Sequence, residues 1–297
     1  MLENIVVTKN EKDAFIGHLF WYSISDDLYS RQGLRNTLKN QGLSEGFMPN
    51  EIRPVDAFRR ATKEVETRVA VNDKLYENFL VRDVYSDVQV AVRHIVKETV
   101  DSQGKRLSYN EKEAVIVLDK KSNTIQITAT PDSVAERQAQ KAVELFDIFK
   151  EHHNGQAVRG MVQSILRTMS PTPMRPSGGI YFIPSAHADT LIKLVNFCSA
   201  FAKGEGFKVP VVESKDNIDM VAKKVGDHLD GILNQCRGAL ADGTLTKSKL
   251  QELLSDARTT VASYKDYENM LTQQQEDMEK RIQEIRDTMM LLMDKSA

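Results

Sequence analysis

The sequence is poor in the residues that build disulfide frameworks and metal clusters. Its 297 residues include two cysteines, Cys198 and Cys236, too few for a disulfide scaffold or a four-cysteine zinc site. The six histidines show no HExxH spacing of the kind that holds zinc on one helix. We therefore expect both cysteines to be buried thiols, and we expect no metal and no cofactor.

The sequence also lacks an excess of positive or negative charge, and it lacks long apolar runs. Forty Lys and Arg oppose 42 Asp and Glu, giving a net charge of −2 and a pI near 6.3; this is not the strongly basic footprint of a nucleic-acid-binding chain. No apolar run approaches the ~20 residues of a membrane span. The first residues, MLENIVVTKNEKD, lack the blocks of a signal peptide. We expect a cytoplasmic protein that does not enter a membrane.

Residues 1–130 are typical of an α+β domain. The apolar segment FIGHLFWYSI, residues 15–24, predicts a buried strand, and helices are predicted between Ser30 and Gly42 and after Pro54. From Leu75 the apolar residues alternate with a period of two, which predicts an antiparallel meander of about four strands. One face of this sheet should be wet, since its polar residues cannot all be buried; these are Arg93, Lys112, Gln126 and Thr128.

Residues 131–213 combine helices with a βαβ-like segment. Ser133 and Glu136 match a capping box that begins one helix, and a second helix follows Gly155. The stretch SPTPMRPSGG, residues 170–179, predicts an exposed loop. A strand, a helix and another strand then follow in order, so we expect a small parallel pair of strands with a helical crossover.

Residues 214–297 show the spacing of a helical hairpin or coiled coil. The apolar seam alternates four- and three-residue steps and is interrupted only by Glu268 and Gln275. We expect a first helix of about 25 residues and a second of about 45, so the end of the second would extend beyond its partner. Its apolar seam residues would then form an interaction surface; they are Met278, Ile282, Ile285, Met289 and Leu292.

Motifs that carry chemistry are scarce. The sequence has no GxxxxGK[ST], no GxGxxG after a strand and no GxSxG elbow. Cys198 lies on an apolar helix face, which indicates an inert core thiol. A non-local enzyme site could use the loop of residues 170–179 with His187 and Ser185, but a capping or surface role for His187 is favoured. The sequence leans against an enzyme without deciding the question.

Positive charge is concentrated on the two N-terminal helices. Arg31 and Arg35 fall on the first, and Arg59 and Arg60 fall on the second; two helices followed by strands could form a winged-helix variant that binds nucleic acid. The connecting loop, residues 41–54, is much longer than the three- or four-residue turn of a helix-turn-helix motif. Arg59 and Arg60 can instead pair with acidic residues of their own helix.

Three segments resemble a known family. WYSIS at residues 21–25, RPVDAFRRAT at residues 53–62 and GGIYFIP at residues 178–184 are similar to segments of an uncharacterised family of prokaryotic and bacteriophage proteins. The resemblance implies a prophage or mobile-element setting, and it transfers no catalytic residues.

We therefore predict a non-enzymatic interaction protein that forms homo-oligomers or binds a partner protein through its C-terminal helices. If it is phage-encoded, it would act in the host cytoplasm on a host or defence complex. The alternative is a nucleic-acid-binding protein that uses the arginine-bearing helices.

Overall fold

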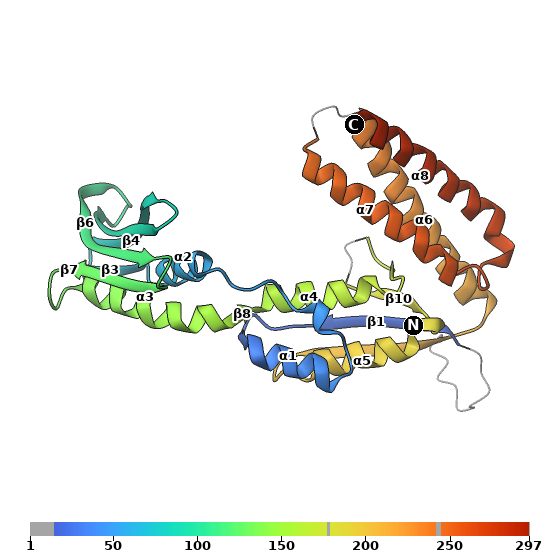
Figure 1. Cartoon of the computed structure of the whole chain (residues 1–297), viewed down its shortest axis with the longest axis horizontal. Coiled ribbons are helices and arrows are strands. Elements are labelled where there is room, and N and C mark those ends of the chain that lie inside the picture. The colour runs from blue at the N-terminus through green and yellow to red at the C-terminus, as the bar shows by residue number, and fades with distance from the viewer. Residues whose placement is uncertain (1–14, 177–178, 242–244, 297) are drawn as a thin grey trace. The chain divides into compact units, whose positions relative to one another are not determined.

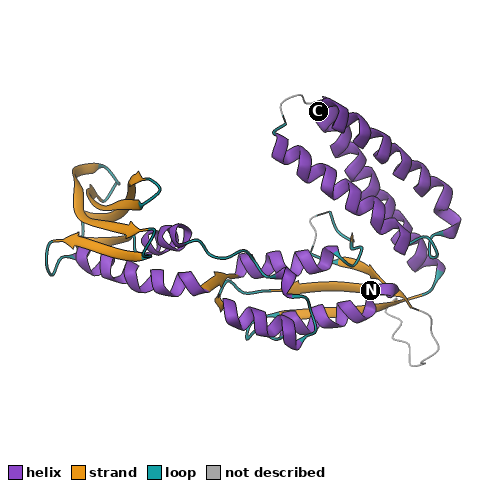
Figure 2. Cartoon of the chain, viewed as in Figure 1, coloured by secondary structure: helices purple, strands orange, loops and turns teal. Residues whose placement is uncertain are grey.

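The computed structural model describes residues 15–176, 179–241 and 245–296 (Figure 1). The fold is mixed α+β, as predicted, with helices and antiparallel sheets (Figure 2). Two compact units are present: unit 1 holds residues 15–26, 35–48 and 157–296, and unit 2 holds residues 27–34 and 49–156. Both are assembled from separated stretches, so they do not coincide with the expected segments 1–130, 131–213 and 214–297.

Unit 1 is built around a four-stranded antiparallel sheet in the order β11-β1-β10-β9. Its strands are β1 (Phe15–Ser23), β9 (Thr172–Pro173), β10 (Tyr181–Pro184) and β11 (Glu205–Val212). Leu19 of β1 pairs with Phe182 on one side and with Val209 on the other. Because β1 pairs antiparallel with both β10 and β11, these two strands run parallel to each other, as the βαβ-like order predicts, but β1 lies between them.

The helices around this sheet begin and end as their sequences direct. They are α1 (Arg31–Asn40), α4 (Gly155–Arg167) and α5 (Ala188–Ser199), with short 3₁₀ turns η1 (Glu45–Phe47) and η2 (Ser185–His187). Ser30 Oγ accepts the Gly33 N–H at 3.0 Å, which caps α1. Gly42 follows the helix at φ +63°, a left-handed conformation that favours glycine. Helix α5 packs on β1 and β11.

The C-terminal helices form a three-helix bundle rather than a hairpin. They are α6 (Lys215–Ala241), α7 (Lys247–Ser263) and α8 (Gln275–Ser296), and α8 packs along both α6 and α7 (Figure 1). The predicted 45-residue helix is wrong, since 3₁₀ turns η3 (Tyr264–Asp266) and η4 (Thr272–Gln274) separate α7 from α8. The break buries Tyr264, Tyr267 and Leu271 at the corner, and this packing replaces helical continuity.

The seam residues of α8 lie inside this bundle. Met278, Ile282, Ile285, Met289 and Leu292 are exposed by 8% or less and pack in one core with α6 and α7. The expectation that they extend beyond an intramolecular partner is therefore wrong. The exposed apolar side chains of α8 are instead Met290, Leu291 and Met293.

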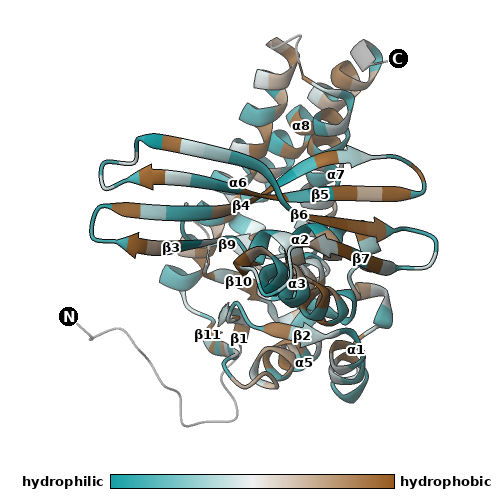
Figure 3. Ribbon diagram, turned by 90° about the vertical axis from the view of Figure 1, so that its left-hand side faces the viewer, coloured by the Kyte–Doolittle hydropathy of each residue, from teal (hydrophilic) through white to brown (hydrophobic). Residues whose placement is uncertain are grey.

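Unit 2 contains a five-stranded antiparallel meander covered on one face by two helices (Figure 3). The strands, in sheet order, are β3 (Thr67–Asn72), β4 (Leu75–Ser86), β5 (Val90–Asp101), β6 (Arg106–Asp119) and β7 (Thr124–Ala129), and the helices are α2 (Pro54–Glu64) and α3 (Val134–Glu151). The predicted meander lacked β3, an edge strand exposed along its whole length. A separate antiparallel pair joins β2 (Leu28–Ser30) to β8 (His152–Asn154).

The core of unit 2 lies between the sheet and the two helices. Phe58 of α2 and Phe146 of α3 meet edge to face, with ring centroids 6.4 Å apart, against Ile95 and Ile116 of the sheet. Helix α3 has the predicted Ser133 cap, whose Oγ accepts the Glu136 N–H at 3.0 Å.

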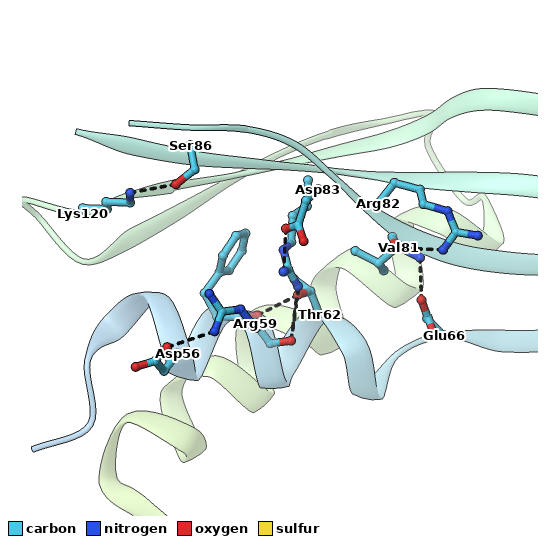
Figure 4. A network of polar contacts seen from close by, with 11 residues as sticks. Asp56, Arg59, Thr62, Glu66, Val81, Arg82, Asp83, Ser86 and Lys120 are labelled. Atoms are coloured by element: carbon cyan, nitrogen blue, oxygen red, sulfur yellow. Dashed lines mark hydrogen bonds and ion pairs between the residues drawn. The ribbon is translucent and has the colours of Figure 1, made fainter. Parts of the chain in front are cut away.

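One arginine of unit 2 is buried under the sheet. Arg93, expected among the polar residues of a wet face, is only 8% exposed. It pairs with Asp83 at 2.6 Å and donates to the Arg59 carbonyl at 3.2 Å and to Thr62 Oγ1; these three partners are shown in Figure 4. Through these hydrogen bonds the guanidinium joins β5 to α2. The same bonds offset the cost of burying its charge.

Candidate functional site

A pocket of about 230 Å³ opens in unit 1, where α4, β10 and residues 170–173 meet helices α6 and α7. Eight of its 17 lining residues carry a hydroxyl group. They are Ser170, Thr172, Tyr181, Thr259, Thr260, Ser263, Tyr264 and Tyr267.

Tyr267 fixes the inner wall of this pocket. Its hydroxyl donates to the Ser170 carbonyl at 2.6 Å and accepts from Thr172 Oγ1 at 2.8 Å. Burial raises the pKa of Tyr267, so the phenol stays neutral. Ser170 has φ +52°, a left-handed conformation that is strained for a residue with a side chain. The bonds from Tyr267 therefore hold an unfavourable backbone turn in place.

Asp266, which precedes Tyr267, contacts Ser170 and His187, two residues of the site that the sequence predicted. His187 Nε2 lies 2.8 Å from Asp266 Oδ2, and Ser170 Oγ donates to the same oxygen. Burial raises the pKa of Asp266, but the hydrogen bonds from Ser170 and His187 outweigh burial, and the net pKa is below its ordinary value. The structure thus brings Ser170 and His187 together, whereas Ser185 is exposed and residues 177–178 of the predicted loop lie outside the described residues.

This cluster does not have the order of a catalytic triad. In a triad the histidine lies between the nucleophile and the acid, so that it can take the proton of the nucleophile. Here the carboxylate of Asp266 lies between Ser170 and His187 and bonds to both. The arrangement fastens residues 170–173 to the turn after α7, and the hydrogen bond of each of Ser170 and His187 in this cluster goes to Asp266.

Three charged or titratable side chains also line the pocket. His228 of α6 faces the α7 residue Asp256; burial lowers the pKa of His228, and the Asp256 charge partly opposes this. Arg167 of α4 is exposed and has no salt bridge in the described part of the chain. It is thus available to a ligand anion.

One lining residue has a polar atom that is left without a partner among the described residues. The Tyr264 hydroxyl is buried and makes no hydrogen bond to any described residue, and burial raises the pKa of this phenol. An unpaired buried hydroxyl costs about 1–3 kcal/mol. Sequence reasoning missed Tyr264 and Asp266, because both lie in the break that the heptad pattern conceals.

Both cysteines are buried thiols, as predicted. Cys198 lies in α5 and Cys236 in α6. Burial raises the pKa of Cys198 to about 12 and also raises the pKa of Cys236, so neither is a reactive thiolate. Among the described residues, no three His, Cys, Asp or Glu side chains are grouped to hold a metal ion.

The two arginines of α1 are engaged within the protein. Arg31 donates to the Pro49 carbonyl at 3.1 Å. Arg35 forms a salt bridge with Glu45 at 3.2 Å. Each side chain thus connects α1 to the segment that follows it.

The two arginines of α2 are engaged as well. Arg59 pairs with Asp56 at 3.2 Å, as its helical spacing allows. Arg60 donates to the His152 carbonyl at 3.2 Å and lies 4.3 Å from the centre of the Phe149 ring. The four arginines expected to contact nucleic acid therefore already serve intramolecular contacts.

Fold and pocket together describe an α+β protein with a C-terminal helical bundle and a pocket of about 230 Å³ in unit 1. The chain belongs to a family of unknown function (DUF6744), whose model matches residues 15–297. This match confirms the resemblance to an uncharacterised family. No curated protein and no solved structure matches the chain. In the described ranges, no helix is both long and apolar enough to pass through a bilayer.

Proposed function

We propose that this chain is a non-enzymatic binding protein that takes a small aromatic carboxylate in the pocket of unit 1. The observation that carries the proposal is the pocket itself, which is lined by the exposed Arg167 and by Tyr264, whose buried hydroxyl makes no hydrogen bond to a described residue. A carboxylate accepts hydrogen bonds from both kinds of group, and a bond to a charged partner is the stronger kind.

The size and the lining of the cavity narrow the ligand. At about 230 Å³ it is smaller than the roughly 300–1,000 Å³ of pockets for drug-sized molecules, which favours one ring with short substituents. Tyr181, Tyr264 and Tyr267 offer ring faces and edges to such a molecule. His228, with its lowered pKa, is neutral at pH 7 and adds a hydrogen-bonding group without charge.

The test is ligand-induced stabilisation by monocyclic aromatic carboxylates, each compared with its neutral amide. A ligand at a hundred times its Kd raises the free energy of unfolding by about 2.7 kcal/mol. We expect the acids to stabilise unit 1 more than the amides, and Arg167→Gln to abolish that difference. Tyr264→Phe should weaken binding without unfolding the protein.

Lys223→Gln is the matched control. Lys223 is exposed on α6 and does not line the pocket, yet its substitution removes the same charge. The proposal fails if no acid stabilises the protein, or if Lys223→Gln and Arg167→Gln weaken binding equally.

A second candidate function is partner binding by the bundle, and the exposed Met290, Leu291 and Met293 of α8 favour it. Apolar side chains on a surface mark interaction sites, and methionine adapts to irregular partners. If the partner is a second copy, light scattering should give a multiple of 33.6 kDa that Leu291→Glu reduces. A monomer at every concentration contradicts self-association.

The resemblance described above also motivates a proposed setting, the cytoplasm of a prokaryotic cell or of a phage-infected host. Genes of the family lying within prophages would support it, and a consistent position among chromosomal housekeeping genes would oppose it.

A further inference from the structure

The sheet of unit 2 carries basic and aromatic side chains in rows across its strands. Arg68 pairs with Asn78, Asn78 with Glu98, and Glu98 with Tyr109, so these four residues form one row across β3 to β6. Directly opposed residues of antiparallel strands share one face of the sheet. Arg68 and Tyr109 therefore lie on the same face.

Two further rows extend this face. Tyr76 is opposed by Val100, which is opposed by Arg106, and Arg82 is opposed by His94. Asn78 and Tyr76 are two residues apart on β4, so strand alternation places their rows on the same side.

This side is opposite to the two helices. Phe79 and Ile95 belong to the core that α2 and α3 cover, and neighbours along a strand point to opposite faces. Asn78 and His94, each adjacent in sequence to one of these core residues, therefore lie on the face that α2 and α3 leave uncovered.

The arginines and tyrosines of this face are already stacked in pairs. The Arg68 guanidinium lies 4.1 Å from the centre of the Tyr76 ring, and that of Arg106 lies 5.4 Å from the centre of the Tyr109 ring. A planar guanidinium held against a ring offers its other side to a second planar group.

The charge of the face is positive. Arg68, Arg82 and Arg106 lie on or beside this face; Glu98 is 8% exposed and already pairs with Arg106 at 2.7 Å, and Glu66, which lies near Arg82, already pairs with Lys63. Arg68 and Arg82 make no salt bridge in the described ranges; Arg82 donates only to the Val81 carbonyl at 3.3 Å, as Figure 4 shows. Two cations are therefore available to an anionic partner.

We propose that this face binds single-stranded nucleic acid, with phosphates at the arginines and bases stacked on the arginine–tyrosine pairs. Single-strand binding combines a cationic surface with planar side chains, because unpaired bases expose their faces. A duplex stacks its bases internally and would use only the charge. This surface is distinct from the arginines of α1 and α2, and the proposal does not depend on the pocket of unit 1.

The test uses the full chain and a fluorescent oligothymidylate of about a dozen nucleotides, within the roughly 4–16 nucleotides that a small sheet domain covers. Fluorescence anisotropy should show binding at low ionic strength that weakens with salt. Replacing Arg68 and Arg106 together by Ala should lower the slope of log K against log salt by about 0.7 for each lost phosphate contact.

Stacking has its own readout. Tyr109→Ala should weaken binding about fivefold or more, and Tyr109→Phe should restore it, because stacking needs the ring and not the hydroxyl. Circular dichroism of Tyr109→Ala separates a loss of binding from a loss of folding. Arg53→Ala is the matched control, because Arg53 is an exposed arginine that precedes α2 and lies outside the face.

Three results would overturn the proposal. One is an absence of binding at low ionic strength. Another is equal affinity for a duplex of the same length. The last is an Arg53→Ala variant that weakens binding as much as Arg68→Ala.

Discussion

Two tyrosines three residues apart on the turn after α7 should respond in opposite ways to the same substitution. Both Tyr264 and Tyr267 are buried. The Tyr267 hydroxyl makes two hydrogen bonds, whereas the Tyr264 hydroxyl makes none to any described residue. Substitution by Phe removes one oxygen and keeps the ring, so any difference between the variants comes from hydrogen bonding.

The expected magnitudes follow from the groups left behind. Tyr267→Phe leaves the Ser170 carbonyl and the Thr172 hydroxyl buried without that partner. At about 1–3 kcal/mol for each such group, we expect a loss of roughly 2–4 kcal/mol in the free energy of unfolding, because the Thr172 hydroxyl can rotate toward another acceptor. Tyr264→Phe removes a hydroxyl that has no partner, so we expect no loss and a gain of up to about 1 kcal/mol.

The single tryptophan makes the measurement specific to unit 1. Trp21 lies in β1 and stacks on Phe207 of β11, with ring centroids 5.5 Å apart. Its fluorescence during urea unfolding therefore reports the unit that holds both tyrosines. Midpoints are compared at equal m-values, since a changed m would indicate a changed unfolded state.

A loss of stability in Tyr264→Phe as large as that in Tyr267→Phe, or larger, would refute this assignment of the two hydroxyls. Tyr109→Phe, a change in the exposed sheet of unit 2, is the control that should leave the Trp21 midpoint unchanged.

Three further predictions concern buried polar groups. Arg93→Ala should lower the free energy of unfolding of unit 2 by about 3 kcal/mol, and Asp83→Asn by less than about 1 kcal/mol, since Asp83 is 80% exposed. Unfolding followed by far-UV circular dichroism measures both losses, and equal losses would contradict this prediction. The free energy of unfolding should decrease as the pH drops below 6.5. Each buried histidine contributes at most about 1.4 kcal/mol per pH unit to this decrease. Burial lowers the pKa of three histidines below the ordinary 6.5, so the unfolded chain binds protons that the folded one does not; equal urea midpoints at pH 7.5 and 5.5 would refute this for His18, His153 and His228. Cys198 and Cys236 should react with a thiol reagent only when the protein unfolds, and fast labelling of the native protein would contradict their burial.

Local chemistry was predictable from the sequence. The caps at Ser30 and Ser133 and the left-handed Gly42 are where the residue types direct them. The helix after Pro54 and the period-two strands after Leu75 also follow the apolar spacing. These signals depend on contacts within a few residues, so one sequence contains them.

Pairing between distant segments was not predictable. Nothing local indicates that β1 separates β10 from β11. The seam of the C-terminal helices fits a bundle core as well as a coiled coil, since both bury the same spacing. The polar Glu268, at an apolar position of the seam, was the sequence signal of the break in the long helix. It lies between the 3₁₀ turns that separate α7 from α8. The pocket draws on α4, β10, α6 and α7, and its assembly requires the tertiary fold.

The central position of β1 has a consequence for synthesis on the ribosome. Unit 2 is complete at residue 156, whereas β1 pairs with residues of β11 as far as Val212. The intervening 212 − 156 = 56 residues take about 3–11 s to translate at roughly 5–20 residues per second. Unit 2 can therefore fold while β1 still awaits first β10, which ends at Pro184, and then β11. The early-made strand is thus among the last to be paired, and during that interval it is the segment a nascent-chain chaperone would bind.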